Sequence, residues 1–143
     1  MIAALSRFCA LPRAERGRTF EAALCLLVAR LAFGVLPFAW GLKLFRLSPG
    51  KGSGGRVAVP EVREVSRAIA RAARHVPFRA VCLQQAFAAL LMLRRRSLAA
   101  TVHLGLARED GTLKAHAWSR CGEVPVTGVG IANDFISVAA FAA

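Results

Sequence analysis

Hydrophobic and polar residues follow three patterns along the chain. Up to about Leu47 the sequence is mostly apolar, and its pattern favours helices. Thr19 is a candidate N-cap for a helix that runs through Arg30, because a threonine hydroxyl can accept a hydrogen bond from a free first-turn amide. Pro37 is expected to end or kink a helix, since proline has no amide proton and its ring disturbs the preceding turn.

The second pattern begins at Pro60, a residue suited to the first position of a helix. Apolar residues then recur at spacings of three and four and predict one buried face: Val62, Val65, Ile69, Ala72 and Val76. Pro77 is expected to end this helix. A second helix is predicted from about Ala80 to Arg96, with a basic end that complements the negative pole of the helix dipole.

The third pattern is the alternation of a half-buried strand. The apolar residues that alternate are Val102, Leu104 and Leu106. Asp110-Gly111 predicts a hairpin turn, and the returning strand runs from Thr112 to Arg120. One face of that strand carries Lys114, His116, Trp118 and Arg120. Residues Val124 to Val129 predict a third antiparallel strand, whereas no element is assigned to the apolar tail that follows.

These patterns divide the chain into an apolar helical region at 1–47, a Gly/Ser-rich linker at 48–59 and a core at 60–143. The linker is expected to be flexible and exposed because of its composition. We expect residues 1–47 to pack with the core in one compact domain. Helices followed by a small antiparallel sheet indicate an α+β fold.

Composition narrows the possible functions. A chain of 143 residues with 56% hydrophobic residues can bury a core, which excludes disorder as its main state. Two of the eight acidic residues are aspartates, which leaves little material for a carboxylate metal site, and we expect no metal or cofactor. The four cysteines form no C-x-x-C pair, and the N-terminus is a poor secretory signal. We therefore expect a cytoplasmic protein with reduced thiols.

The apolar stretch from Ala22 to Leu42 is long enough for a membrane span, but Arg30, Gly34 and Pro37 interrupt it. Packed helices fit this stretch better. Contact of residues 20–46 with a membrane surface or with a partner protein stays open, because basic residues flank the stretch and attract anionic lipid.

Cys82 lies at or just inside the predicted start of a helix, and His116 lies in the middle of a later strand. The free N–H groups of a helix start favour a thiolate, and a nearby histidine can accept the thiol proton. The pair therefore predicts a thiol nucleophile that attacks a carbonyl carbon. Each residue taken alone also fits a simpler interpretation, since Cys82 suits a small core residue and His116 a solvated side chain.

Three runs of residues carry a family resemblance: Arg79-Ala80-Val81-Cys82-Leu83-Gln84-Gln85-Ala86, Val102-His103-Leu104-Gly105-Leu106, and Ala115-His116-Ala117-Trp118. They resemble the nucleophile helix and the histidine strand of lasso-peptide leader peptidases, which are transglutaminase-like cysteine proteases. The resemblance extends from about Phe20 to Gly128. It implies a nucleophile helix packed on a small antiparallel sheet, as in transglutaminase and papain-like cores.

The resemblance also implies an activity and partners. The expected reaction is cleavage of a lasso precursor peptide at the junction between leader and core, after which a separate lasso cyclase uses the freed core amine. In this family a small strand-rich module recognises the leader. The first 60 residues show no alternating strand pattern, so a separate leader-binding recognition protein is expected.

By the same resemblance Cys82 is the nucleophile and His116 the general base. The expected substrate and oxyanion environment includes Leu83, Gln84 and Trp118. The family usually has an aspartate about a dozen residues after the histidine, where this chain reads Pro125-Val126-Thr127-Gly128. The third member is therefore open between Asp134, Thr127 and a backbone carbonyl.

Other functional classes compete with the peptidase interpretation. The formal charge of +12, from 20 basic and 8 acidic residues, suits a basic module that binds acidic lipid or nucleic acid. Nucleic acid is not expected, because the arginines are spread along the chain and no aromatic-basic RNA motif is present. An acyltransferase and an inactive relative of the same fold also fit the motifs.

Overall fold

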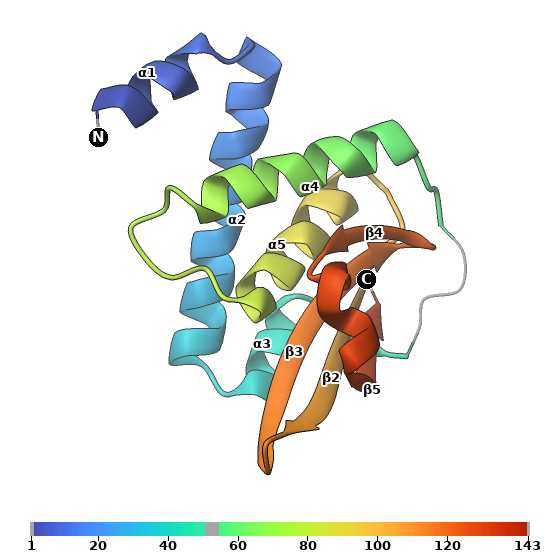
Figure 1. The fold of residues 1–143 in the computed structure, drawn as a ribbon. Helices are drawn as coiled ribbons and strands as arrows, with labels where there is room; N and C mark the ends of the chain where they lie inside the picture. Colours follow the sequence, from blue (N-terminus) through green and yellow to red (C-terminus); the bar gives the residue numbers. More distant parts are fainter. Residues whose placement is uncertain (1, 51–54, 143) are drawn as a thin grey trace.

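The computed structural model describes residues 2–50 and 55–142, and they form an α+β fold (Figure 1). The α-helices are α1 (Ile2–Ala10), α2 (Arg13–Val35), α3 (Phe38–Leu44), α4 (Val59–Ala73) and α5 (Cys82–Arg95). The remaining elements are β1 (Ser48–Pro49), β2 (Thr101–Glu109), β3 (Thr112–Cys121), β4 (Val124–Thr127), the 3-10 helix η1 (Val129–Asp134) and β5 (Ile136–Ala142).

The strands form one sheet in the order β1-β5-β2-β3-β4, and all pairings are antiparallel. The predicted hairpin is confirmed, since Asp110 and Gly111 join β2 to β3 with φ angles of 50° and 75°. The predicted third strand is also confirmed, as β4. The apolar tail, to which the sequence assigned no element, forms β5 and pairs with β2.

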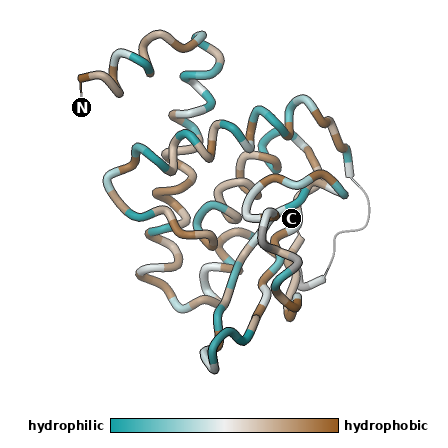
Figure 2. Tube along the Cα trace, viewed as in Figure 1, coloured by the Kyte–Doolittle hydropathy of each residue, from teal (hydrophilic) through white to brown (hydrophobic). Residues whose placement is uncertain are grey.

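Helices α4 and α5 pack against the sheet, and α2 packs on α4 and α5, so α5 lies at the centre of this packing (Figure 1). The buried residues of α5 are Ala86, Phe87, Ala88, Ala89, Leu90, Met92 and Leu93. The predicted buried face of α4 is confirmed for Val62, Val65, Ile69 and Ala72, although the helix ends at Ala73, before Pro77. Figure 2 shows hydrophobic stretches along the helices and a hydrophilic tip on the β2–β3 hairpin.

The prediction that Thr19 caps a helix is wrong. Helix α2 begins six residues earlier, at Arg13, and Thr19 is buried within it. Its hydroxyl donates to the carbonyl of Glu15 at 2.8 Å and accepts a hydrogen bond from Arg71 of α4 at 3.1 Å. The prediction for Pro37 is confirmed, because α2 ends at Val35 and α3 begins directly after Pro37.

The linker predicted at 48–59 is partly structured. Ser48 and Pro49 form β1 and pair with the end of β5, so this part is not free, and Val59 already belongs to α4. Residues 51–54 lie outside the described part of the chain. Among the helices of residues 2–50 and 55–142, none has the length and hydropathy needed to cross a membrane.

Candidate active site

Cys82 is the first residue of α5, and the residue before it, Val81, is extended with φ −77° and ψ 167°. The thiol is half-buried and packs, with Leu83, against the edge of the hydrophobic core. The amides of the first helical turn have no carbonyl partner within the helix. Cys82 therefore lies at the end of the helix that carries partial positive charge.

Two glutamines hold the chain segment that leads into this helix. The amide of Val81 donates to Oε1 of Gln84 at 3.2 Å, and Nε2 of Gln85 donates to the carbonyl of Ala80 at 2.9 Å. Gln84 was expected to lie in the substrate environment. Its carboxamide oxygen caps the start of α5. These bonds fix the backbone of Ala80 and Val81, the two residues that precede Cys82.

His116 lies in the middle of β3, opposite Gly105 of β2. Its Nε2 atom is 2.7 Å from the carbonyl oxygen of Gly128. A carbonyl oxygen can only accept, so Nε2 carries the proton in this bond. In the neutral imidazole, Nδ1 is then the nitrogen with a free lone pair, and it is the atom able to accept a proton.

Gly128 approaches the imidazole because it has no side chain. Its φ angle is +66°, and a Cβ atom there would lie 2.6 Å from the carbonyl oxygen of Ala117 and 3.0 Å from Nε2 of His116. Both the backbone conformation and the close approach require glycine. The carbonyl that orients His116 thus depends on a residue without a Cβ atom.

Two aromatic rings lie next to the imidazole of His116. The ring of Trp118 stacks on those of both His116 and His103, with centroid distances of 6.0 Å and 5.5 Å. The ring of Phe135, which directly follows η1, is 5.1 Å from that of His116. Trp118 is buried, and it approaches Gly105 so closely that a Cβ atom there would lie 2.6 Å from its ring.

The other two candidates for the third member are placed differently. Thr127 is buried, and its hydroxyl is hydrogen bonded to that of Ser119 at 2.7 Å. Asp134 is exposed at the end of η1 and makes no hydrogen bond or ion pair with any residue that the structure describes. The Nε2 atom of His116 is therefore hydrogen bonded to the carbonyl of Gly128. Neither Thr127 nor Asp134 forms a hydrogen bond with His116.

Helix α5 packs along β3, so the two halves of the predicted nucleophile come from neighbouring elements (Figure 1). Ala117 of β3 belongs to the core between helices and sheet, whereas His116 and Trp118 alternate with it and stack on each other. Within the described residues, the thiol of Cys82 forms no hydrogen bond with His116. The pairing of Cys82 with His116 therefore stays a prediction.

A family model for the transglutaminase-like superfamily matches residues 23–138. The chain belongs to the transglutaminase-like superfamily. The match runs from within α2 into β5 and contains both Cys82 and His116. Comparison with curated proteins and with solved structures finds no match.

The transglutaminase-like superfamily includes cysteine peptidases, and the four cysteines of this member are all free thiols. Cys25 and Cys121 are buried and Cys9 is exposed on α1. Burial, with a further contribution from Glu21, raises the pKa of Cys25 to about 11. Burial also raises the pKa of Cys121. Cys25 and Cys121 thus remain protonated at neutral pH, which makes them poor nucleophiles.

The sequence did not identify three residues that contact His116 or Trp118 in this transglutaminase-like domain. Gly128 lies twelve residues after His116, about where the related peptidases have an aspartate. A glycine at this position does not indicate that its backbone carbonyl binds the histidine. Gly105 and Phe135 come from β2 and from the chain after η1, and only the folded sheet brings them together. Across residues 2–50 and 55–142, no three His, Cys, Asp or Glu side chains gather to hold a metal ion.

Proposed function

We propose that this chain is a cysteine peptidase that removes the leader from a lasso precursor peptide. The observation that carries the proposal is the combination, within a transglutaminase-like domain, of Cys82 as the first residue of a helix with His116 on the neighbouring strand. The hydrogen bond from Nε2 to Gly128 supports it, because it leaves Nδ1 of His116 available as a base.

In the proposed reaction, Nδ1 of His116 accepts the thiol proton, and the sulfur of Cys82 attacks the carbonyl carbon of the last leader residue. Free amides at the start of α5, including that of Cys82, stabilise the oxyanion. His116 then returns the proton to the amine of the core peptide, which leaves as the C–N bond breaks. Water, deprotonated by His116, hydrolyses the remaining thioester and releases the leader with a free carboxylate.

His116 is oriented by the backbone carbonyl of Gly128 and not by a carboxylate, and this arrangement is compatible with a thiol nucleophile. The Gly128 oxygen orients the imidazole, but it carries only a partial charge and stabilises an imidazolium less than an aspartate does. A thiol ionises more readily than a hydroxyl, so a cysteine nucleophile depends less on a third member. The proposed mechanism therefore needs no contribution from Asp134.

The proposal includes two other proteins. A separate leader-binding recognition protein presents the precursor, and the described part of the segment before α4, with three helices and the short strand β1, is not the strand-rich module that recognises the leader. A lasso cyclase then consumes the freed core, whose new amine is the group that closes the ring. The masses of the leader and core fragments would identify the bond that is cleaved in a given precursor.

Mass spectrometry of a synthetic lasso precursor, incubated with this chain and a leader-binding protein, tests the proposal. We expect a leader fragment and a core fragment with the wild type, and no cleavage above background with Cys82→Ala or His116→Ala. Circular dichroism verifies that both variants fold, and Cys9→Ala, which changes an exposed thiol on α1, is the matched control with full activity. Cleavage by Cys82→Ala at the wild-type rate contradicts the proposal.

Two further outcomes separate the alternatives. Transfer of the leader acyl group to an added amine, in preference to water, identifies an acyltransferase that uses the same thioester. Cleavage that is equally fast without the leader-binding protein contradicts the proposed partner but not the peptidase.

A further inference from the structure

The outer face of α2 is apolar, although it faces away from the core. The large hydrophobic residues exposed on it are Phe20, Leu24, Leu27, Val28, Leu31 and Val35, each between 41% and 77% exposed. They recur at spacings of three and four, so they form one stripe, about 24 Å long at the rise of an α-helix. The opposite face of α2 packs into the core through Ala22, Cys25, Leu26, Ala29 and Ala32.

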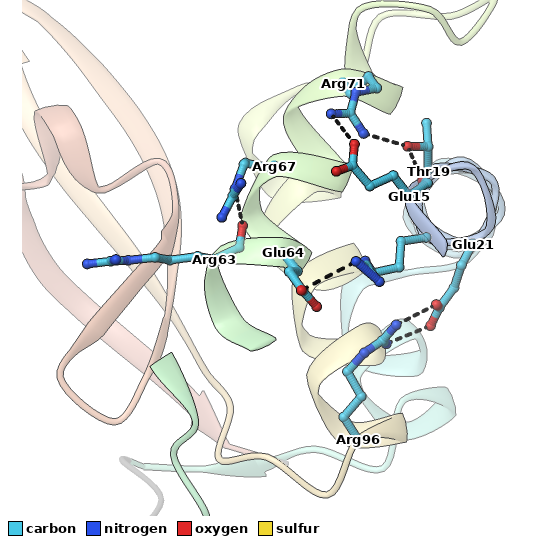
Figure 3. Close-up of polar contacts among 9 residues, drawn as sticks. Glu15, Thr19, Glu21, Arg63, Glu64, Arg67, Arg71 and Arg96 are labelled. Carbon is cyan, nitrogen blue, oxygen red and sulfur yellow. Dashed lines mark hydrogen bonds and ion pairs between the residues drawn. The ribbon is translucent and has the colours of Figure 1, made fainter. Parts of the chain in front are cut away.

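The acidic residues of α2 do not lie on this stripe. Glu15 forms an ion pair with Arg71 of α4 at 3.4 Å, and Glu21 forms two hydrogen bonds with Arg96, which follows α5, at 2.9 and 2.8 Å. Figure 3 shows both carboxylates directed toward the neighbouring helices. The exposed charged residues of α2 are Arg13 and Arg30. The outer face therefore combines apolar side chains with basic residues and no acidic residue, and the guanidinium of Arg30 lies over the ring of Phe78, 5.2 Å from its centroid.

Helices α1 and α3, on either side of α2, also expose apolar side chains, and α3 exposes a lysine. On α3, Trp40 and Leu44 are 63% and 60% exposed, and Lys43 is exposed between them. Helix α1 has no buried residue and projects from the body of the molecule, with Ile2 and Leu5 exposed (Figure 1). Figure 2 shows hydrophobic stretches along α2. Exposed apolar surface of this extent marks an interaction site.

We propose that the outer face of α2, with Trp40 of α3, binds the surface of an anionic lipid bilayer. Leucine, valine and phenylalanine insert between the lipid chains, tryptophan lies at the level of the headgroups, and arginine and lysine contact the lipid phosphates. The net charge of +12 attracts the whole chain to an anionic surface. A second copy fits less well, because it brings two cationic faces together.

Sedimentation of the full chain with lipid vesicles tests this proposal. We expect binding to vesicles that contain phosphatidylglycerol to be about tenfold or more stronger than binding to pure phosphatidylcholine, and to weaken in about 1 M salt. The variant Leu24→Glu/Leu31→Glu places two carboxylates on the stripe, where they repel the lipid, so it should lose binding by about tenfold or more. Both positions are exposed, so this variant is expected to fold.

The matched control is Leu113→Glu/Val138→Glu, which makes the same exchange at exposed positions of the sheet and should keep its binding. Tryptophan fluorescence adds a second measurement, because Trp118 is buried and Trp40 is exposed. A blue shift with anionic vesicles that disappears in Trp40→Phe locates the contact at α3.

Three results overturn the proposal. In the first, the wild type stays unbound with anionic vesicles. In the second, Leu24→Glu/Leu31→Glu binds as well as the wild type. In the third, the wild type binds anionic vesicles no better than phosphatidylcholine vesicles and instead forms a dimer, or a complex with the leader-binding protein, that this variant loses. None of these results depends on Cys82, so the lipid proposal and the peptidase proposal fail independently.

Discussion

The Nε2 nitrogen of His116 lies 2.7 Å from the carbonyl oxygen of Gly128, twelve residues further along the chain. The lasso leader peptidases that this sequence resembles have an aspartate at about this separation. A backbone oxygen holds the imidazole here, so a side-chain acid is not needed to orient the ring.

Gly128→Ala should displace the carbonyl from His116. The φ angle of +66° is unfavourable for alanine, and the new Cβ atom would lie 2.6 Å from the oxygen of Ala117. We expect a loss of about 1–3 kcal/mol in the free energy of unfolding and a drop of about tenfold or more in precursor cleavage. Urea unfolding and mass spectrometry measure the two effects. Gly130→Ala is the control, because nothing lies within 4 Å of a Cβ atom at that position.

Gly105→Ala should disturb the stack of Trp118 on His116. A Cβ atom at this position would lie 2.6 Å from the ring of Trp118 and 2.9 Å from the Cβ atom of Phe135. We expect the variant to be destabilised by about 1–3 kcal/mol, as in other overpacked sites, with altered near-ultraviolet circular dichroism from the displaced indole. An unchanged spectrum together with unchanged stability would show that the strand gives way without moving Trp118.

Glu21→Gln should destabilise the packing of α2 on α5. The carboxylate accepts hydrogen bonds from Arg96, and these bonds hold the pKa of Glu21 below its usual range. Removal of the charge leaves the partly buried guanidinium of Arg96 without its counter-ion and should cost about 2 kcal/mol in thermal or urea unfolding, although the carbonyl of Met92 still accepts one hydrogen bond from it. Glu109→Gln is the control and should have no measurable effect, because Glu109 contacts Lys114 in full solvent.

Stability should fall as the pH rises from about 9 to about 11, because burial raises the pKa of Cys25 to about 11 in the folded chain. The unfolded thiol ionises first, so it loses its proton while the folded thiol keeps it, and alkali therefore favours unfolding by about 1–2 kcal/mol across this window. Urea unfolding at a series of pH values measures the slope. Cys25→Ala should reduce the slope without removing it, because burial also raises the pKa of Cys121, whereas Cys9→Ala, which changes an exposed thiol, should leave the slope unchanged.

Local patterns were sufficient for several elements. Val62, Val65 and Ile69 identified the buried face of α4, because a helical period of apolar residues has one favourable packing direction. Asp110-Gly111 identified the hairpin, because both residues tolerate positive φ. The motif around Cys82 placed it at the start of a helix, and α5 begins there.

Other features depend on contacts between distant segments. Thr19 has the chemistry of an N-cap, but packing of α2 on α4 extends the helix through it and pairs its hydroxyl with Arg71. The apolar tail has no clear period, and it becomes β5 because β2 offers a free edge beside it. The bond from His116 to Gly128 also depends on the turn after β4, whose path the residue types do not specify.

The sequence by itself determined the superfamily, the α+β order of elements and the two residues that we propose for the chemistry, because these depend on residue identity and short-range period. Only the tertiary structure decided which group holds the imidazole, which side of α2 meets the core and where its acidic residues lie. Those features follow from the register of the sheet and the packing of helices far apart in the chain, and no local pattern encodes such distances.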